Sequence, residues 1–303
     1  MKRLPVLACL TFVLITNFSS AAQNSSAAPV RPKILGVARI DLRTDNLAAA
    51  RKFYGVILGF DTLDQSPDTS AAIFKINDHQ YVDITPNLTD PKQDRLIRIA
   101  FETADAEQLR AYLAGQGIKV PDHTSQADGN LSFGLTDPDG HDVEFVQYLP
   151  GSLEGRNIGK HMPATRVSDR MIHVGFVVND RAAEDHFYGD ILGFHSIWHG
   201  GMKDDQTDWV DMRVPDGTDW LEYMLNVHNP DPRTLGVMHH LALGVPSVAK
   251  GFEIVTARGY KGEKPQIGRD GKWQLNLYDP NYTRVELMEP KPVKKPCCSP
   301  MLQ

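Results

Sequence analysis

One eight-letter motif occurs twice in the chain and constrains how the rest of it can fold. FYGVILGF spans residues 53–60 and FYGDILGF spans residues 187–194, so seven of the eight letters agree at an offset of 134. Each motif belongs to a run of apolar residues at helical spacing and follows an alternating, strand-like pattern. Gly59 and Gly193 stand where a helix ends in a left-handed cap. Both copies therefore predict a strand followed by a helix that ends at its glycine.

The match between the two halves resumes further along the chain at a larger offset. Residues 98–120 correspond to 240–262, and the run that begins at Asp137 (DPDG) corresponds to the run that begins at Asp279 (DPNY), both at an offset of 142. A constant offset on either side of an insertion is typical of a duplicated domain. The eight additional residues of the second copy are expected in the loop 199–209.

The repeat also sets the expected domain boundaries. We predict a first domain at 36–149 and a second domain at 171–290, and two domains also fit a chain of 303 residues. The segment 150–170, rich in Gly, Pro and charge, is the expected linker, and residues 291–303 form a tail. The composition fits folded domains, since 41% of the residues are hydrophobic and 23% are charged.

The first residues have the pattern of a secretory signal. A basic start is followed by an apolar run and then by small residues, and cleavage is expected after Ala22. The apolar run, residues 4–15, is too short to span a bilayer. We therefore predict a signal peptide at 1–22, a short linker at 23–35, and a mature protein that is periplasmic or secreted and has no membrane span.

Charge and cysteine content exclude two further possibilities. Loss of Lys2 and Arg3 with the signal changes the formal charge from −6 to −8, and the folded part of the chain has no Lys/Arg cluster, so nucleic acid is not an expected partner. Cys9 also leaves with the signal. The remaining Cys297 and Cys298 are neighbours in the tail and cannot link distant parts of a fold. The domains must therefore be held by apolar cores rather than by disulfides.

The order of the elements and the motifs together resemble a known superfamily. Each copy has the pattern strand, helix and several short strands, and then strand, helix and strands again. The FY…ILGF helix end, the strand after the mid-domain break and the closing DP…VE pattern resemble the vicinal oxygen chelate superfamily, which includes glyoxalase I, extradiol dioxygenases and bleomycin resistance proteins. This resemblance implies an α+β fold of two tandem domains, each a pair of βαβββ modules that form a curled mixed sheet around a concave cavity.

The resemblance also implies metal ligands on the first and last strands of each module, pointing into that cavity. On four strands of the second copy, alternation puts the apolar residues on one face and a ligand-type side chain on the other. These side chains are His173, Glu222, His240 and Glu286. A lone histidine is more often structural than a ligand, but four such residues with the same facing predict a metal site. His239 falls on the apolar face and is excluded.

The first copy lacks this ligand set. Arg39 and Arg98 occupy the positions of the two histidines, Glu144 takes the place of the last glutamate, and Asp83 lies near the place of the first. An arginine cannot ligate a metal, because it remains protonated and offers only hydrogen-bond donors. We therefore expect a degenerate, metal-free first domain, in which two guanidinium groups replace the cation and neutralise the two carboxylates.

The predicted site suits one divalent metal ion, and its two histidines and two glutamates are compatible with Zn, Ni, Co, Mn or Fe. Such an ion acts as a Lewis acid on an α-hydroxycarbonyl or enediolate, while a glutamate moves the proton. The resemblance to glyoxalase-type members implies that Glu286 or Glu222 is the catalytic base, with Glu286 favoured. The leading hypothesis is an exported lyase or isomerase whose partner is a small-molecule substrate. Because glutathione belongs mainly to the cytosol, export argues against a housekeeping glyoxalase.

Two other functions remain compatible with the sequence, which also leaves the oligomeric state open. An Fe(II) extradiol ring-cleaving dioxygenase would use His173, His240 and Glu286 as a facial triad and would also have tandem domains. Against it, the additional acid–base histidine of that family is missing, Asn276 stands where its tyrosine is expected, and Glu222 would be an unexplained fourth ligand. The third hypothesis is a non-catalytic protein that binds or sequesters a metal or a small molecule.

Overall fold

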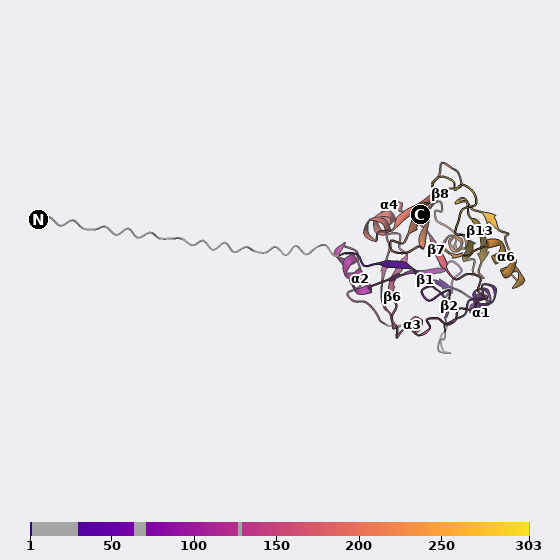
Figure 1. The fold of residues 1–303 in the computed structure, drawn as a ribbon, viewed down its shortest axis with the longest axis horizontal. Helices are drawn as coiled ribbons and strands as arrows, with labels where there is room; N and C mark the ends of the chain where they lie inside the picture. Colours follow the sequence, from indigo (N-terminus) through magenta and orange to yellow (C-terminus); the bar gives the residue numbers. More distant parts are fainter. Residues whose placement is uncertain (2–29, 64–70, 127–128, 303) are drawn as a thin grey trace.

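The computed structural model describes Met1 and residues 30–63, 71–126 and 129–302. The expected signal peptide, residues 1–22, lies outside these ranges except for its first residue. The described chain forms two mixed sheets with helices around the outside (Figure 1). This is the α+β architecture that the sequence predicted. Among these residues no helix combines the length and the apolar character needed to cross a membrane.

The first copy supplies a six-stranded sheet in the order β2-β3-β1-β4-β6-β5. Its two halves each begin with a strand and a helix. The first half consists of β1 (Ile34–Arg43), α1 (Leu47–Arg51), the π-helix η1 (Lys52–Ile57), β2 (Ala72–Lys75) and β3 (Tyr81–Thr85). The second half consists of β4 (Leu96–Thr103), α2 (Ala106–Gly115), β5 (Leu131–Thr136) and β6 (Asp142–Gln147). The helix α3 (Leu153–Arg156) lies in the linker that follows.

The second copy supplies an eight-stranded sheet in the order β12-β13-β14-β11-β7-β10-β9-β8. Its first half consists of β7 (Met171–Val177), α4 (Arg181–Glu184), the π-helix η2 (Asp185–Ile191), β8 (His195–Gly200), β9 (Trp209–Arg213) and β10 (Trp220–Met224). After α5 (Pro232–Met238), the second half consists of β11 (His240–Gly244), α6 (Val248–Ala257), β12 (Gln266–Ile267), β13 (Trp273–Tyr278) and β14 (Arg284–Met288). The first copy has no full strands equivalent to β8 and β12 among its described residues. Isolated β-bridges, from Thr62 to Phe74 and from Ser125 to Ser132, lie at the equivalent positions.

The repeated helix is wider in its second half than helical spacing alone predicts. In both copies a short α-helix continues as a π-helix, so that the N–H of Leu58 donates to the carbonyl of Phe53 over 3.0 Å. The wider turn lets two neighbouring residues, Phe53 and Tyr54, both lie in the core. Gly59 and Gly193 then follow at φ of 81° and 82°, which confirms the predicted left-handed caps.

The strand register corrects the place where the second copy is longer. Asp83 pairs with Asp41 in the first sheet, and Glu222 pairs with Gly175 in the second. Asp41 and Gly175 are equivalent at the offset of 134, so Asp83 and Glu222 are equivalent at an offset of 139. Five additional residues therefore lie before β10, and the other three lie between β10 and β11, where α5 is found. The expectation of one eight-residue insertion at 199–209 is wrong, whereas the match of Asp83 to Glu222 is confirmed.

The two copies are joined by a shared core and by reciprocal hydrogen bonds. One continuous cluster of buried apolar side chains draws on both sheets. The hydroxyl of Tyr54 donates to Asp279 Oδ2, and the hydroxyl of Tyr188 donates to Asp137 Oδ2, each over 3.2 Å. Each tyrosine comes from the FYG motif of one copy and each aspartate from the DP motif of the other. The repeated motifs therefore build the boundary between the copies, and the expected apolar cores form a single core.

A buried glutamate at this boundary makes the stability of the fold depend on pH. Glu184 is fully buried, and its Oε1 accepts a hydrogen bond from the N–H of Asp139 over 2.9 Å. Burial, together with the nearby Asp137, raises the pKa of Glu184 from 4.5 to about 8. The folded state thus favours the protonated carboxyl more than the unfolded state does. The stability that this group contributes is complete below about pH 4.5 and is lost as the pH rises through about 8.

Replacing Glu184 by glutamine should flatten this pH dependence. The amide keeps the shape of the side chain and stays neutral, so between about pH 5 and pH 8 the variant should lose less free energy of unfolding than the wild type, by up to a few kcal/mol. Urea titrations at a series of pH values measure the difference. The exposed Glu253→Gln is the matched control and should follow the wild type. An unchanged decline in Glu184→Gln would contradict the role given to this carboxyl.

Candidate metal centre

Four neighbouring strands of the second sheet bring the predicted residues onto one concave face. These strands follow one another in the order β14-β11-β7-β10. In register, each of the four predicted residues lies beside a position that Ala or Gly occupies on the next strand. The two rows are Glu286–Ala242–His173 and His240–Gly175–Glu222. The small residues leave the space into which the four larger side chains converge.

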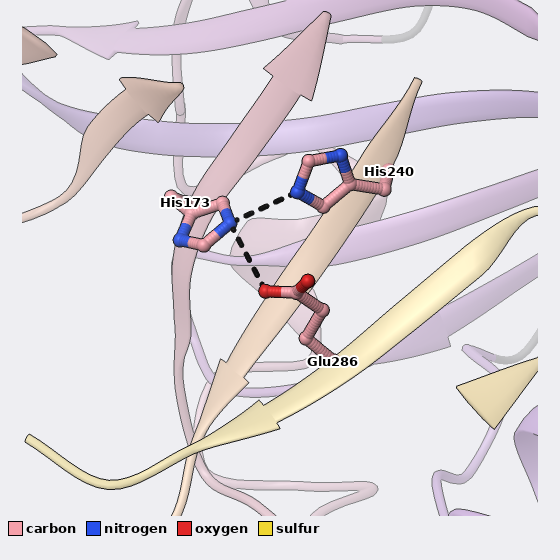
Figure 2. Close-up of side chains that lie close together, drawn as sticks. All are labelled: His173, His240 and Glu286. Carbon is pink, nitrogen blue, oxygen red and sulfur yellow. Dashed lines mark hydrogen bonds and ion pairs between the residues drawn. The ribbon is translucent and has the colours of Figure 1, made fainter. Parts of the chain in front are cut away.

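Three of these side chains form a compact cluster, which Figure 2 shows between β7, β11 and β14. One ligand-type atom from each of His173, His240 and Glu286 lies within 4.8 Å of the others. Nε2 of His173 is 3.1 Å from Nε2 of His240 and 3.6 Å from Oε2 of Glu286. All three residues are buried, with at most 5% of their surface exposed. Glu222 reaches the same place, since its Oε2 lies 3.0 Å from Nε2 of His240 and 3.8 Å from Nε2 of His173.

The surroundings of the two imidazoles favour the neutral form that a metal ligand needs. Nδ1 of His240 lies 2.8 Å from the carbonyl of Met238 and donates to it, which leaves the lone pair of Nε2 facing the cluster. Burial, with a further contribution from Arg284, lowers the pKa of His240 to about 3. Burial also lowers the pKa of His173 well below its ordinary value, although Glu222 opposes the shift. Both imidazoles are therefore uncharged at neutral pH, as metal binding requires.

A divalent cation fits this donor set. Two imidazole nitrogens and two carboxylate oxygens converge where Arg284 offsets only one negative charge, through an ion pair of 3.2 Å with Glu286. Uncompensated charge is unfavourable in a buried site, and a bound cation would neutralise it. In the described part of the chain, Nδ1 of His173 has no hydrogen-bond partner, so no hydrogen bond at that nitrogen fixes the tautomer, and the ring can present the lone pair of Nε2 to a cation. The donor types accept Zn, Ni, Co, Mn or Fe and leave the metal open.

The cluster opens onto a cavity of about 440 Å³, which is large enough for a small organic molecule. His173, Glu222 and Glu286 form the polar part of its lining at the cluster. Aromatic and thioether side chains form most of the apolar wall. They are Trp198, Trp209, Trp220, Met202, Met224, Met238 and Met288.

Two polar residues of the cavity lining that lie beside the cluster, Arg284 and Asp211, were not predicted from the sequence. Nη2 of Arg284 lies 3.0 Å from Nε2 of His240, and the residue shares a strand face with Glu286, two positions away. Alternation along β14 therefore carried a signal for it. Asp211 on β9 lies opposite Glu222 in register and is buried. Burial is the main cause that raises the pKa of Asp211 well above its ordinary value, and repulsion from the negative charge of Glu222 is the second.

The equivalent positions of the first copy hold ion pairs. Nη2 of Arg39 lies 2.7 Å and Nη1 of Arg98 lies 2.9 Å from the same oxygen, Oε2 of Glu144. Burial raises the pKa of Glu144, but the two guanidinium groups more than offset this effect and hold the pKa below its ordinary value. The predicted pairing of two arginines with this carboxylate is thus confirmed.

The second carboxylate of the first copy is not the one expected. Nε of Arg39 lies 2.5 Å from Oδ1 of Asp41, which is two residues along the same strand and occupies the position of Gly175. Unlike Asp41, Asp83 has a carboxylate oxygen, Oδ1, that is buried and has no hydrogen-bond partner among the described residues. Burial, followed by repulsion from Asp41, raises the pKa of Asp83 to about 7. The arginines therefore neutralise Glu144 and Asp41, and the expectation for Asp83 is wrong.

His239, the neighbour of His240, faces away from the cluster as alternation predicts. Its Nδ1 lies 2.9 Å from Oδ2 of Asp94, which belongs to the first copy. The residue thus takes part in the boundary between the copies and not in the candidate metal centre.

Comparison with a family model matches both copies of the repeat. The model described as "Glyoxalase/Bleomycin resistance protein/Dioxygenase superfamily" matches residues 36–145 and 170–287. No curated protein sequence matches the chain.

Several solved structures share the fold. An extradiol ring-cleaving dioxygenase from B. fuscum is 18% identical, with 86% of this chain and 73% of that chain covered and a TM-score of 0.64. Homoprotocatechuate 2,3-dioxygenase from Arthrobacter globiformis is 17% identical, with 86% and 80% covered and a TM-score of 0.63. The 2,3-dioxygenase LapB from Pseudomonas sp. KL28 is 16% identical, with 88% and 97% covered and a TM-score of 0.64. At these identities the likeness is one of fold.

Replacing both histidines by alanine should remove the metal. The double variant His173→Ala/His240→Ala lacks both nitrogen donors, and elemental analysis of the purified protein should find no bound metal. The matched control Arg39→Ala/Arg98→Ala should retain the metal. It should lower the free energy of unfolding by about 3–5 kcal/mol, because Glu144 is left buried without its partners. Metal retained in the histidine variant would contradict the assignment.

Adding one methyl group at Gly175 should disrupt the same centre. A Cβ on Gly175 would overlap the imidazole of His240, so that ligand must move. Metal affinity, measured by competition with a chelator, should fall at least about tenfold. Gly134→Ala is the control, because the methyl group added in β5 would meet its nearest neighbour, the carbonyl oxygen of Val143, at 3.7 Å. Wild-type affinity in Gly175→Ala would show that the ligand set does not depend on this space.

Proposed function

The chain belongs to the Glyoxalase/Bleomycin resistance protein/Dioxygenase superfamily, and on this premise we propose that its second copy is a metal-dependent lyase or isomerase centre. The substrate in this proposal is a small α-hydroxycarbonyl compound, or a related one that forms an enediolate. His173, His240 and Glu286, with Glu222, would hold one divalent ion, which supplies Lewis acidity to the carbonyl group of the substrate. The cavity of about 440 Å³ beside these residues would admit the substrate.

Glu222 is the residue whose position supports this reaction type. Its Oε2 lies within 3.8 Å of Nε2 of both His173 and His240, so a fourth donor reaches the cluster. The resulting His/Glu/His/Glu set is the pattern of the glyoxalase-type members that the sequence resembles. A three-ligand centre would leave the nearness of this carboxylate without a role.

The two glutamates differ in a way that favours Glu222 for the proton transfer. Glu286 is held by its ion pair with Arg284, and 6% of its side chain is exposed. The side chain of Glu222 is 16% exposed and lines the cavity. Glu222 would take the proton from the carbon beside the carbonyl and return it to the neighbouring carbon or oxygen, while Glu286 keeps its orientation. This reverses the preference for Glu286 that the sequence alone suggested.

A ring-cleaving dioxygenase is the second candidate. The compact set of His173, His240 and Glu286 has the composition of a facial triad for non-haem iron. Asn276, which stands at the expected place of the family's tyrosine, donates from Nδ2 to Glu263 over 3.2 Å and is not part of the cavity lining. Among the described residues that line the cavity, His173 is the only histidine, which leaves the acid–base role of that mechanism without a candidate.

We also propose that the protein is exported, on the signal-like pattern of residues 1–22. Export would favour a periplasmic or extracellular substrate over a glutathione adduct. Sequencing the N-terminus of the protein purified from the exported fraction should give a chain that starts after Ala22. A protein retained in the cytosol with residues 1–22 intact would contradict this proposal and would leave the metal centre unaffected.

Comparison of Glu222→Gln with Glu286→Gln separates the two enzyme functions. If Glu222 is a ligand, both variants should lose metal affinity well beyond the roughly ten- to hundredfold that is typical of changes around the ligands. Oxygen uptake with catechols should be absent in the wild type. Metal content, metal affinity and oxygen consumption measure these outcomes. Full metal retention in Glu222→Gln, together with catechol-dependent oxygen uptake, would favour the dioxygenase.

A further inference from the structure

The tail of the chain, residues 291–302, joins the two edges of the second sheet. The N–H of Cys297 donates to the carbonyl of Arg269, in the loop after β12, over 2.8 Å. The N–H of Leu302 donates to the carbonyl of Ile197, in β8, over 2.8 Å. β12 and β8 are the outermost strands of that sheet, and in Figure 1 the end of the described chain lies beside β8. We call residues 291–302 the tail clasp.

The tail clasp holds residues that form the wall of the metal cavity. Nε1 of Trp198 donates to the carbonyl of Cys297 over 3.2 Å, and the carbonyl of Arg269 accepts a hydrogen bond from the N–H of Cys297 over 2.8 Å. Trp198 and Arg269 both line the cavity, from loops and strands that are far apart in the sequence. The position of this part of the wall therefore depends on where the tail clasp lies.

A disulfide between adjacent residues lies in the middle of the tail clasp. Cys297 and Cys298 are bonded to one another and are both half-buried. The small ring that this bond closes includes the peptide between them, and Cys298 has a φ of 71°, which a residue with a side chain rarely adopts. The hydroxyl of the next residue, Ser299, accepts a hydrogen bond from the N–H of His199 and donates one to the carbonyl of His199, each over 2.9 Å. The contacts of the tail clasp with β8 thus begin directly at the ring.

We propose that Cys297 and Cys298 form a thiol–disulfide exchange site that controls access to the metal cavity. The disulfide form keeps the tail clasp across the sheet edges and the cavity wall in place. The dithiol form releases the constraint on Cys298, so the hydrogen bonds on either side of it loosen and the wall at Trp198 opens. The regulatory meaning rests on the proposed function of the cavity, whereas the exchange and the movement of the tail clasp do not.

The exchange requires a dithiol reductant, which supplies two electrons. One of its thiolates attacks Sγ of Cys298, the bond between the two cysteines breaks, and Cys297 leaves as a thiolate. The second thiolate of the reductant then displaces Cys298, and the reductant leaves as a cyclic disulfide. Both cysteine thiolates take up protons from water. An oxidant that accepts two electrons from the dithiol reverses the step.

Quenching of tryptophan fluorescence by acrylamide reads the cavity wall directly, with or without a bound metal. Three of the four tryptophans, Trp198, Trp209 and Trp220, line the cavity. The quenching slope of the mature wild-type chain should rise after treatment with a dithiol reductant, and titration should then find two free thiols per chain. The double variant Cys297→Ser/Cys298→Ser should show the higher slope at all times and should not respond to the reductant.

Two outcomes would overturn the proposal. The slope could stay unchanged although two thiols appear, which would show that the disulfide does not hold the wall. Alternatively, the thiols could fail to appear under native conditions, which would show that the bond does not exchange. The wild-type comparison decides between these results even if the double variant does not fold. A second measurement, the rate at which a chelator removes bound Co²⁺, tests the metal centre separately. If the quenching slope depends on the redox state but the protein binds no Co²⁺, the metal centre is contradicted and the exchange site is still supported.

Discussion

A buried carboxylate needs a positive partner, and the two copies meet this requirement in different ways. Removing a charge from water costs several kcal/mol unless an opposite charge compensates it. In the first copy Arg39 and Arg98 lie against Glu144. In the second copy the same positions carry the neutral imidazoles of His173 and His240, and Arg284 pairs with Glu286, so among the described side chains Glu222 has only the two imidazoles as partners. The proposal of a metal in one copy and none in the other follows from this one exchange of side chains.

An arginine and an imidazole need different amounts of space beside the carboxylates, and the residues on the adjacent strand differ accordingly. Gly175 leaves the room that the imidazole of His240 fills, while Asp41 at the equivalent position supplies a second carboxylate to Arg39. The first copy still supports the second, because the two share a core and exchange the hydrogen bonds of Tyr54 and Tyr188. A copy that lacks the four-residue ligand set is thus still an integral part of the fold.

The sequence predicted the features that depend on periodicity within one strand or on the repeat. The duplication and the left-handed caps follow from spacing. The convergence of His173, His240 and Glu286 follows from the family resemblance, which implies the ligand-bearing strands, and from alternation within those strands. Features that depend on pairing between strands were not accessible: the length difference is divided around β10, and Asp41 takes the place expected for Asp83. The tail clasp is held mostly through backbone atoms, which carry no residue-specific signal, so the sequence could suggest a tail but not its contacts.

Anomalous X-ray diffraction from crystals of the metal-loaded protein tests the central claim most directly, because it locates every bound transition-metal ion. The account predicts one strong peak on the second sheet, within bonding distance of Nε2 of His173, Nε2 of His240 and a carboxylate oxygen of Glu286. It predicts no peak between Arg39 and Arg98 in the first copy. The described residues contain two other groups of ligand-type side chains, Asp137/His141/Glu184 and Asp204/Cys297/Cys298. A peak at one of these groups, with none at the two histidines, would contradict the account.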